Sequence, residues 1–268
     1  MALPSPPPRW DAHAHVFAGP VRAGSHYTPD ERTLQMWQSA AAPCGIDRVV
    51  LVQPSVYGTD NSVMLNALRH AGGVHRGVAV LAPDVTEAAL ADMHAAGVRG
   101  VRFNLVSPVG NDLADVDGII ARVRPLGWHA QFFLRPMQYG WVRERQPRWG
   151  VTVVLDHIGG MHADYPAQAH MRALDALADQ GTWVKLSGFY RLGSAAPFRE
   201  VGELIAKLHA KFAGRMVWGS DWPHTWYMEA ARGAAPSYDC LLAPLAHAFP
   251  DAAIRESILC DAPARLYQ

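Results

Sequence analysis

The sequence predicts a single-domain (β/α)8 barrel, the TIM-barrel architecture of the α/β class. Two observations support this prediction. Eight short apolar segments alternate along the chain with eight segments of helical length, and most of the apolar segments are continuous rather than patterned in alternation. Continuous apolar strands are typical of a parallel sheet that is covered on both faces. Eight strand–helix units within 268 residues match the size of one barrel.

The predicted elements follow in order along the chain. Strands are predicted over residues 10–17, 47–55, 77–83, 100–106, 129–135, 151–160, 182–189 and 216–221. Helices are predicted over residues 30–44, 61–71, 86–96, 115–125, 138–148, 165–180, 197–212 and 238–259. Good helix starts support the first three helices, and Gly97 closes the third. No G-x-G-x-x-G follows the first strand, which disfavours a dinucleotide-binding sheet.

Composition excludes several classes of protein. Lys plus Arg and Asp plus Glu both number 24, so nothing predicts binding to nucleic acid or to an anionic membrane. The three cysteines are far apart in the sequence and predict neither a disulfide framework nor a thiolate zinc site. Residues 1–8 are predicted to form a proline-rich arm, and residues 9–268 the barrel. Without a signal peptide or an apolar membrane span, a cytoplasmic protein is expected.

Polar side chains stand at the ends of three predicted strands. His13 and His15 lie on the first strand, His157 ends the sixth, and Asp221 ends the eighth. A single buried histidine is more often structural than functional, but in a barrel these strand ends share one mouth. Four such groups together can bind a divalent metal, or they can polarise a carbonyl group while the carboxylate activates water.

Several motifs resemble those of the amidohydrolase superfamily, in particular the branch that contains 2-pyrone-4,6-dicarboxylate lactonase. They are D-A-H-A-H-V-F at 11–17, D-H-I-G-G at 156–160 and W-G-S-D-W-P-H at 218–224. Shorter similarities lie at 27–29, 53–61, 99–104 and 263–267. The resemblance implies a TIM barrel that hydrolyses a lactone or a related carbonyl compound. It implies Asp221 as the general base, with His13, His15 and His157 polarising the carbonyl group.

The resemblance also bears on metal binding. The wider superfamily holds zinc with the help of a ligand at the end of the fifth strand, whereas residues 132–135 of this chain read F-F-L-R. His129 stands at the other end of that strand. The lactonase branch works without a metal, and we therefore expect no cofactor. The alternative is one zinc ion, held by His13, His15, His157 and Asp221.

Substrate binding is assigned to side chains around the mouth. Arg102 and Arg191 suit a carboxylate, because a guanidinium group can pair with it through two hydrogen bonds. The alternative for each arginine is a structural ion pair. Ser55, Asn104 and His224 are further predicted substrate contacts, and Tyr190 and Trp222 are predicted to form the pocket wall.

The chain departs from the lactonase branch in two segments. That branch has a second basic residue after the R-F-N motif, whereas residues 105–109 carry no charge. Phe132 and Phe133 occupy a strand that carries a tyrosine in the branch. We therefore expect a small-molecule lactone with one acid group. There are two alternatives to a lactone hydrolase: a zinc-dependent hydrolase or decarboxylase on the same barrel, and a small-molecule binder without catalysis. Each of the three functions is compatible with a homo-oligomer.

Overall fold

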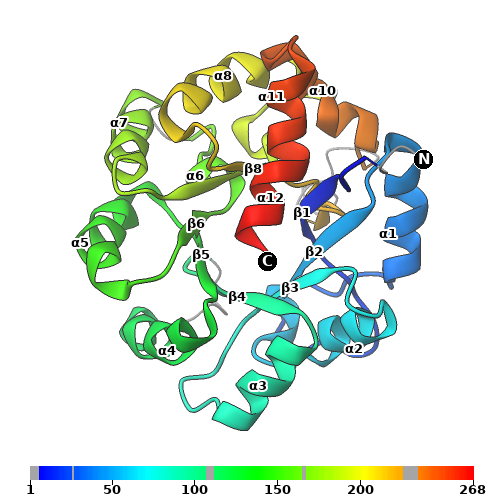
Figure 1. The fold of residues 1–268 in the computed structure, drawn as a ribbon, viewed down its shortest axis with the longest axis vertical. Coiled ribbons are helices and arrows are strands. Elements are labelled where there is room, and N and C mark those ends of the chain that lie inside the picture. The colour runs from blue at the N-terminus through cyan, green and yellow to red at the C-terminus, as the bar shows by residue number, and fades with distance from the viewer. Residues whose placement is uncertain (1–5, 26, 107–111, 165–166, 226–234) are drawn as a thin grey trace, which may run out of the picture.

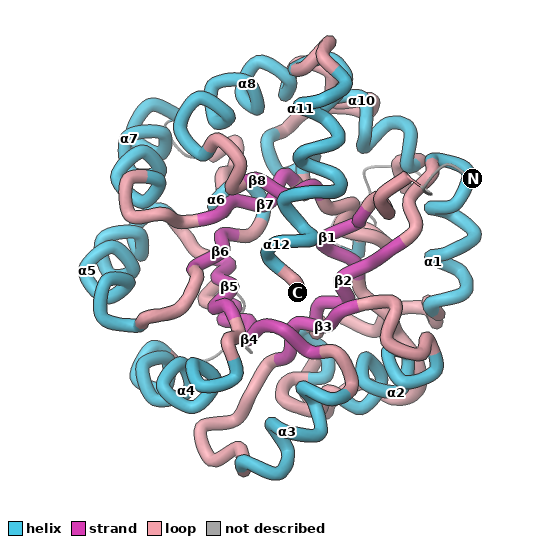
Figure 2. The backbone as a smooth tube through the Cα atoms, viewed as in Figure 1, coloured by secondary structure: helices cyan, strands magenta, loops and turns pink. Residues whose placement is uncertain are grey.

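Eight parallel strands form a ring inside a layer of helices in this computed structural model, which describes residues 6–25, 27–106, 112–164, 167–225 and 235–268 (Figure 1). Strands that are adjacent in the ring are also consecutive in the sequence, from β1 to β8. Figure 2 shows the strands as an inner ring and most of the helices outside it. The predicted (β/α)8 barrel is confirmed.

The strands are three to seven residues long, and most of the helices that follow them are eight to twelve. The strands are β1 (Trp10–Ala14), β2 (Arg48–Val52), β3 (Arg76–Ala79), β4 (Val98–Asn104), β5 (His129–Phe133), β6 (Val153–Leu155), β7 (Trp183–Leu186) and β8 (Met216–Trp218). The helices are α1 (Leu34–Ala41), α2 (Ser62–His70), α3 (Glu87–Ala95), α4 (Val116–Val123), α5 (Tyr139–Trp149), α6 (His157–Gly160), α7 (Ala167–Ala178), α8 (Val201–Phe212), α10 (Tyr238–Ala248), α11 (Ala252–Glu256) and α12 (Ala262–Leu266). Across the described ranges, no helix has both the length and the apolar character needed to span a bilayer.

All eight strands end before their predicted C-terminal limits, and the largest differences lie in the sixth strand and in the last helix. The sixth strand stops at Leu155, and residues 157–160 form the short turn labelled α6. The long C-terminal helix is broken after Ala248, where Phe249 leaves the helical conformation ahead of Pro250. Asp251 then accepts a hydrogen bond from the backbone N–H of Ala253 and starts α11. The remaining chain forms a π-helical turn and α12, which overlies the centre of the strand ring in the view of Figure 1.

The barrel interior changes character along its axis. At its N-terminal end Trp10 stacks on Tyr267, with ring centroids 6.1 Å apart, and both side chains are buried. Further toward the C-terminal end the buried residues are polar, including Gln131 and Lys185. Buried polar groups are costly unless they are paired, so this layer needs an extensive network of hydrogen bonds and ion pairs. That network lies directly beneath the mouth.

The seam between β8 and β1 closes the ring at the site. The backbone N–H of Asp221 donates to the carbonyl oxygen of His13 at 2.8 Å, and that of His15 donates to the carbonyl oxygen of Trp222 at 2.8 Å. A Cβ atom on Gly219 would lie 2.6 Å from Cβ of His13, so a side chain there would force the two segments apart. Barrel closure and site assembly therefore depend on the same backbone contacts.

Candidate active site

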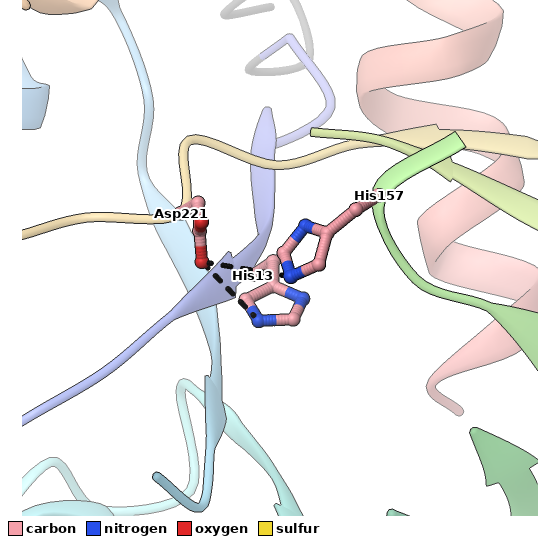
Figure 3. Close-up of side chains that lie close together, drawn as sticks. All are labelled: His13, His157 and Asp221. Carbon is pink, nitrogen blue, oxygen red and sulfur yellow. Dashed lines mark ion pairs between the residues drawn. The ribbon is translucent and has the colours of Figure 1, made fainter. Parts of the chain in front are cut away.

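Three imidazole rings converge on one carboxylate oxygen at the C-terminal end of the barrel. Nε2 of His15 lies 3.4 Å from Oδ1 of Asp221. The corresponding distances for His13 and His157 are 3.6 and 4.0 Å. Figure 3 shows His13, His157 and Asp221 pointing toward one another. All four side chains are buried. The structure thus brings together the four residues that the sequence placed at strand ends.

Hydrogen bonds at Nδ1 direct two of these rings. Nδ1 of His15 lies 2.7 Å from the carbonyl oxygen of Val52. Because a carbonyl only accepts, the neutral ring carries its proton on Nδ1 and presents a lone pair at Nε2. Nδ1 of His157 lies 2.9 Å from the hydroxyl group of Ser187, which can donate to it. His157 can therefore keep its proton on Nε2, so the two rings present an acceptor and a donor to the site.

A second carboxylate, Asp156, lies on the other side of His13. Its Oδ1 is 3.3 Å from Nδ1 of His13, and its Oδ2 accepts from Nε of Arg102 at 3.1 Å. Gln131 also donates to Oδ2, at 3.0 Å, and Nζ of Lys185 lies 3.8 Å from Oδ1. Burial alone would raise the pKa of Asp156, but its interactions with His13, Arg102 and Lys185 hold it well below its usual value. The sequence analysis missed Asp156, although it stands next to His157 in the D-H-I-G-G motif.

The charge on Asp221 is stabilised in the same way. Burial alone would raise its pKa, but the imidazoles, His157 foremost, and the guanidinium group of Arg191 hold it well below the usual value. Burial lowers the pKa of His13 to about 3, and burial also lowers that of His157 far below its usual value. At neutral pH the site therefore contains an ionised carboxylate at Asp221 and neutral rings at His13 and His157. A carboxylate in this state can accept a proton from water.

The backbone at the site adopts a conformation that L-residues rarely take. His157, Asp221 and His224 have φ values of 50°, 61° and 65°. They are three of the five non-glycine residues with positive φ in the described chain. Each such residue costs roughly 1–2 kcal/mol, and residues of this kind cluster at functional sites. The strain lies in the two loops that carry the catalytic candidates.

Asp11 anchors the loop that presents Asp221. Its Oδ1 accepts from the backbone N–H groups of Ser220 and His13, at 2.9 and 3.0 Å. Its Oδ2 accepts from the Ser220 hydroxyl group at 2.5 Å, from Tyr238 at 2.6 Å and from Trp37 at 3.1 Å. One fully buried carboxylate thus joins β1, α1, the loop after β8 and α10. The sequence analysis did not assign it a role, although Asp11 opens the D-A-H-A-H motif.

The sequence matches a known family over nearly its whole length. The model of the amidohydrolase family described as Amidohydro_2 matches residues 10–268. The chain belongs to the amidohydrolase family. It is a hydrolase of this family, homologous at about 30% identity to enzymes named for lactone substrates.

Three relatives show how far this similarity extends. The 2-pyrone-4,6-dicarboxylate hydrolase of Comamonas testosteroni is 30% identical over 96% of this chain and 89% of its own length. The 4-sulfomuconolactone hydrolase of Rhizobium radiobacter is 31% identical, over 96% and 89%. The crystal structure of a protein from Pseudomonas putida described as a 2-pyrone-4,6-dicarboxylic acid hydrolase has a TM-score of 0.84 at 33% identity, with 97% of each chain covered.

The site of this amidohydrolase fits one metal ion, which members of the superfamily bind. His13, His157 and Asp221 each offer a ligand atom, and these atoms lie within 4.8 Å of one another. Among the described residues this is the single group of at least three His, Cys, Asp or Glu side chains close enough for that purpose. Nε2 of His13 has no hydrogen-bond partner among the described residues. Imidazole and carboxylate donors suit zinc, and His15 could complete the set.

The end of β5 offers no further ligand. Phe133 stands there, and its ring contacts that of His157 edge to face, with centroids 5.0 Å apart. His129 lies at the opposite end of the barrel, against Tyr267. The sequence analysis also placed Phe133 near the end of the fifth strand and His129 at its other end. The expectation that the protein works without metal remains a prediction.

The two arginines predicted to bind substrate have different surroundings. The guanidinium group of Arg191 lies 5.1 Å from the ring centroid of Phe133, and its Nη2 lies 3.6 Å from Oδ2 of Asp221. It is therefore at the mouth. Arg102 is ion-paired with Asp156 beneath the histidines, and its Nη1 lies 3.4 Å from the carbonyl oxygen of Gln53. For Arg102, the structure therefore supports the alternative, a structural ion pair.

The remaining predicted contacts lie on the loops around the mouth. Ser55 starts a 3-10 turn after β2, and Asn104 ends β4, where its Oδ1 accepts from the backbone N–H of Val106 at 3.2 Å. His224 is buried, and burial lowers its pKa to about 4. The predicted wall residue Trp222 is nearly buried. Their roles toward substrate remain predictions.

Proposed function

We propose that this amidohydrolase opens a lactone that carries a carboxylate. The observation that carries the proposal is the convergence of three imidazoles on Oδ1 of one buried, ionised aspartate. Asp221 supplies a base, and the imidazoles supply groups that can hold a carbonyl oxygen. The names of two relatives support a lactone substrate, and Arg191 at the mouth supports an anionic one.

The proposed reaction begins with a water molecule at Oδ1 of Asp221. Asp221 takes one proton of the water molecule as the water oxygen attacks the lactone carbonyl. The second proton of the water molecule donates a hydrogen bond to a lone pair such as that on Nε2 of His15. His157 is the ring best placed to polarise the carbonyl oxygen, because it can donate from Nε2 while neutral, and His13 lies beside it with ring centroids 4.8 Å apart. The resulting oxyanion is stabilised by fixed donors.

Collapse of the tetrahedral intermediate completes the proposed reaction. The bond from the carbonyl carbon to the ring oxygen breaks, and the proton held by Asp221 passes to that oxygen. The products are a carboxylic acid, which ionises, and a hydroxyl or enol group on the same open chain. His224, which follows Asp221 by three residues, is the candidate to contact the leaving oxygen.

Replacing the base tests the proposal. Asp221→Asn should retain the fold and substrate binding but lose kcat by 10²–10⁴-fold, the usual contribution of a general base. Turnover of a panel of carboxylated lactones is the measurement, with circular dichroism for the fold. Asp92→Asn, an exposed aspartate in α3, is the matched control and should behave as wild type. A kcat above roughly one tenth of the wild-type value in Asp221→Asn would exclude the assigned role.

The cluster of His13, His157 and Asp221 favours a second candidate, a zinc-dependent hydrolase or decarboxylase. When bound, zinc would act as a Lewis acid and lower the pKa of a bound water molecule. Because β5 supplies no ligand, we predict that activity survives prolonged chelation and that elemental analysis finds substoichiometric metal. One zinc per chain, with activity lost on its removal and restored on its return, would establish the second candidate instead.

We further propose that the substrate carries a single acid group. Among the described residues, Arg191 is the Lys or Arg side chain that pairs with Asp221, whereas Phe133 makes the neighbouring wall apolar. The uncharged segment 107–109, on which this expectation also rests, lies outside the described residues. A charged group without a partner costs several kcal/mol in a buried site, so a dicarboxylate should be a poorer substrate than its monocarboxylate analogue. Efficient hydrolysis of 2-pyrone-4,6-dicarboxylate would contradict this.

A further inference from the structure

The two oxygens of Asp221 have different surroundings. Oδ1 faces the Nε2 atoms of three histidines, as described above. Oδ2 accepts a hydrogen bond from the hydroxyl group of Tyr190 and lies 3.6 Å from Nη2 of Arg191. Tyr190 and Arg191 both belong to a 3-10 turn, Phe189–Leu192, that follows β7. The carboxylate is thus held from one side by the β7 turn and faces the proposed reaction centre with its other oxygen.

The position of Tyr190 makes this contact rigid. Its side chain is fully buried, and its ring lies 5.6 Å from the guanidinium group of Arg191 and 6.4 Å from the ring of His224. A buried side chain has little rotational freedom left to lose when it donates a hydrogen bond. The turn itself is anchored, because its Arg191 carbonyl oxygen accepts from the backbone N–H of Ala163 at 3.1 Å.

An unsupported aspartate would not maintain this orientation. The χ2 torsion of aspartate is broad, so the plane of the carboxylate can rotate about one bond. A partial rotation would move the oxygen that faces the three imidazoles away from them. A fixed donor on the other oxygen restrains the plane, because the rotation would break its hydrogen bond.

We infer that Tyr190 is a positioning residue, which holds the plane of the Asp221 carboxylate so that one of its oxygens faces the histidines. This inference rests on the proposed function, in which Oδ1 is the atom that takes the proton from water. The sequence analysis assigned Tyr190 to the pocket wall. In the structure its hydroxyl group, and not its ring alone, contributes to the site. Tyr190 acts through Asp221 and needs no contact with the substrate.

Tyr190→Phe tests the inference, because it removes the hydroxyl group and leaves the packed ring in place. Orientation of a reacting group affects the chemical step, so kcat should fall by roughly 10–100-fold while KM changes by no more than about three-fold. Tyr57→Phe is the matched control. Tyr57 is also buried and hydrogen-bonded, but to the backbone of Ala18, 3.0 Å away. That variant should keep its kcat.

The outcomes separate this inference from the proposed function. If Asp221→Asn abolishes turnover and Tyr190→Phe retains at least half of the wild-type kcat, the inference is wrong and the function stands. If Asp221→Asn stays active, the function itself is wrong. A fall in kcat with unchanged KM and unchanged melting temperature supports the inference. A parallel loss of kcat and melting temperature in Tyr190→Phe would show a structural role and would overturn it.

Discussion

The two arginines of the site show how one residue type serves two purposes. Arg102 neutralises Asp156, which in turn holds His13, and its guanidinium group is largely buried within the barrel. Arg191 lies at the mouth against two aromatic rings. A guanidinium group that lies over an aromatic ring can also pair with a carboxylate. Their positions predict different kinetic consequences when either residue is truncated.

Arg191→Ala should lower kcat/KM for a carboxylated lactone by on the order of 10²-fold or more, because a charge-assisted pair is lost. The same variant should affect the neutral methyl ester much less. Arg102→Ala should impair both compounds, because it leaves Asp156 without its closest cation beneath His13. Kinetics on the acid and the ester with both variants are the measurement. An equal loss on both compounds in Arg191→Ala would show that it supports the pocket and does not bind the acid.

At the scale of single elements, the turn after β6 is the most constrained. Four consecutive residues, 157–160, have positive φ. The turn sends His157 back over the barrel mouth, where a regular strand would have continued outward. Gly160 is required at its end, because a Cβ atom there would lie 2.0 Å from the carbonyl oxygen of Leu134 and φ is 76°. The orientation of His157 therefore depends on a glycine three residues away.

Gly160→Ala should destabilise the protein by roughly 2 kcal/mol or more, from left-handed strain and the clash with Leu134. For a chain of this size that corresponds to a melting temperature lower by about 4 °C or more. Activity should fall as His157 shifts. Gly118→Ala is the control, because Gly118 lies within α4 with nothing within 4 Å of its would-be Cβ. That variant should be slightly more stable. Equal melting temperatures for the two variants would contradict this account.

At the scale of the whole molecule, the fold buries histidines far from the site. Burial lowers the pKa of His129 to about 3 and that of His75 to about 4. Neighbouring Lys185 contributes to the first shift, and Arg48 and Arg76 contribute to the second. Both rings are neutral in the folded protein at pH 7, whereas in the unfolded chain they titrate near pH 6.5.

Stability should therefore decline as the pH falls below about 6.5. The folded pKa values lie below the unfolded one, so the unfolded chain binds more protons in this window and the stabilisation present at higher pH is progressively lost. Each histidine should contribute a loss of about 2 kcal/mol between pH 7 and pH 5. Urea unfolding at pH 7, 6 and 5 measures the free energy of unfolding. In His129→Gln this free energy should depend less steeply on pH, by the uptake of about one proton on unfolding. A stability that does not change over this range would exclude the explanation.

The sequence by itself determined the barrel and the location of its site. Hydrophobic continuity over short segments identifies strands buried on both faces, and strict alternation with helices leaves few other folds. Because the C-terminal ends of parallel strands share one edge, His13, His15, His157 and Asp221 could be placed together without coordinates. The motifs around them added the family. All of these inferences depend on local pattern or on strand order alone.

Only the tertiary structure decided how those side chains are supported. The donor to Asp221 comes from Tyr190, and the acid behind His13 is Asp156, far from its partner in the sequence. Such pairs depend on register and on side-chain direction across several strands, which no local pattern encodes. Local sequence pattern also does not encode the positive φ of His157. The surrounding packing maintains this φ value, although a histidine residue intrinsically disfavours it. Residue types at strand ends indicate which chemistry is available, and the packed barrel decides which atom of each faces the substrate.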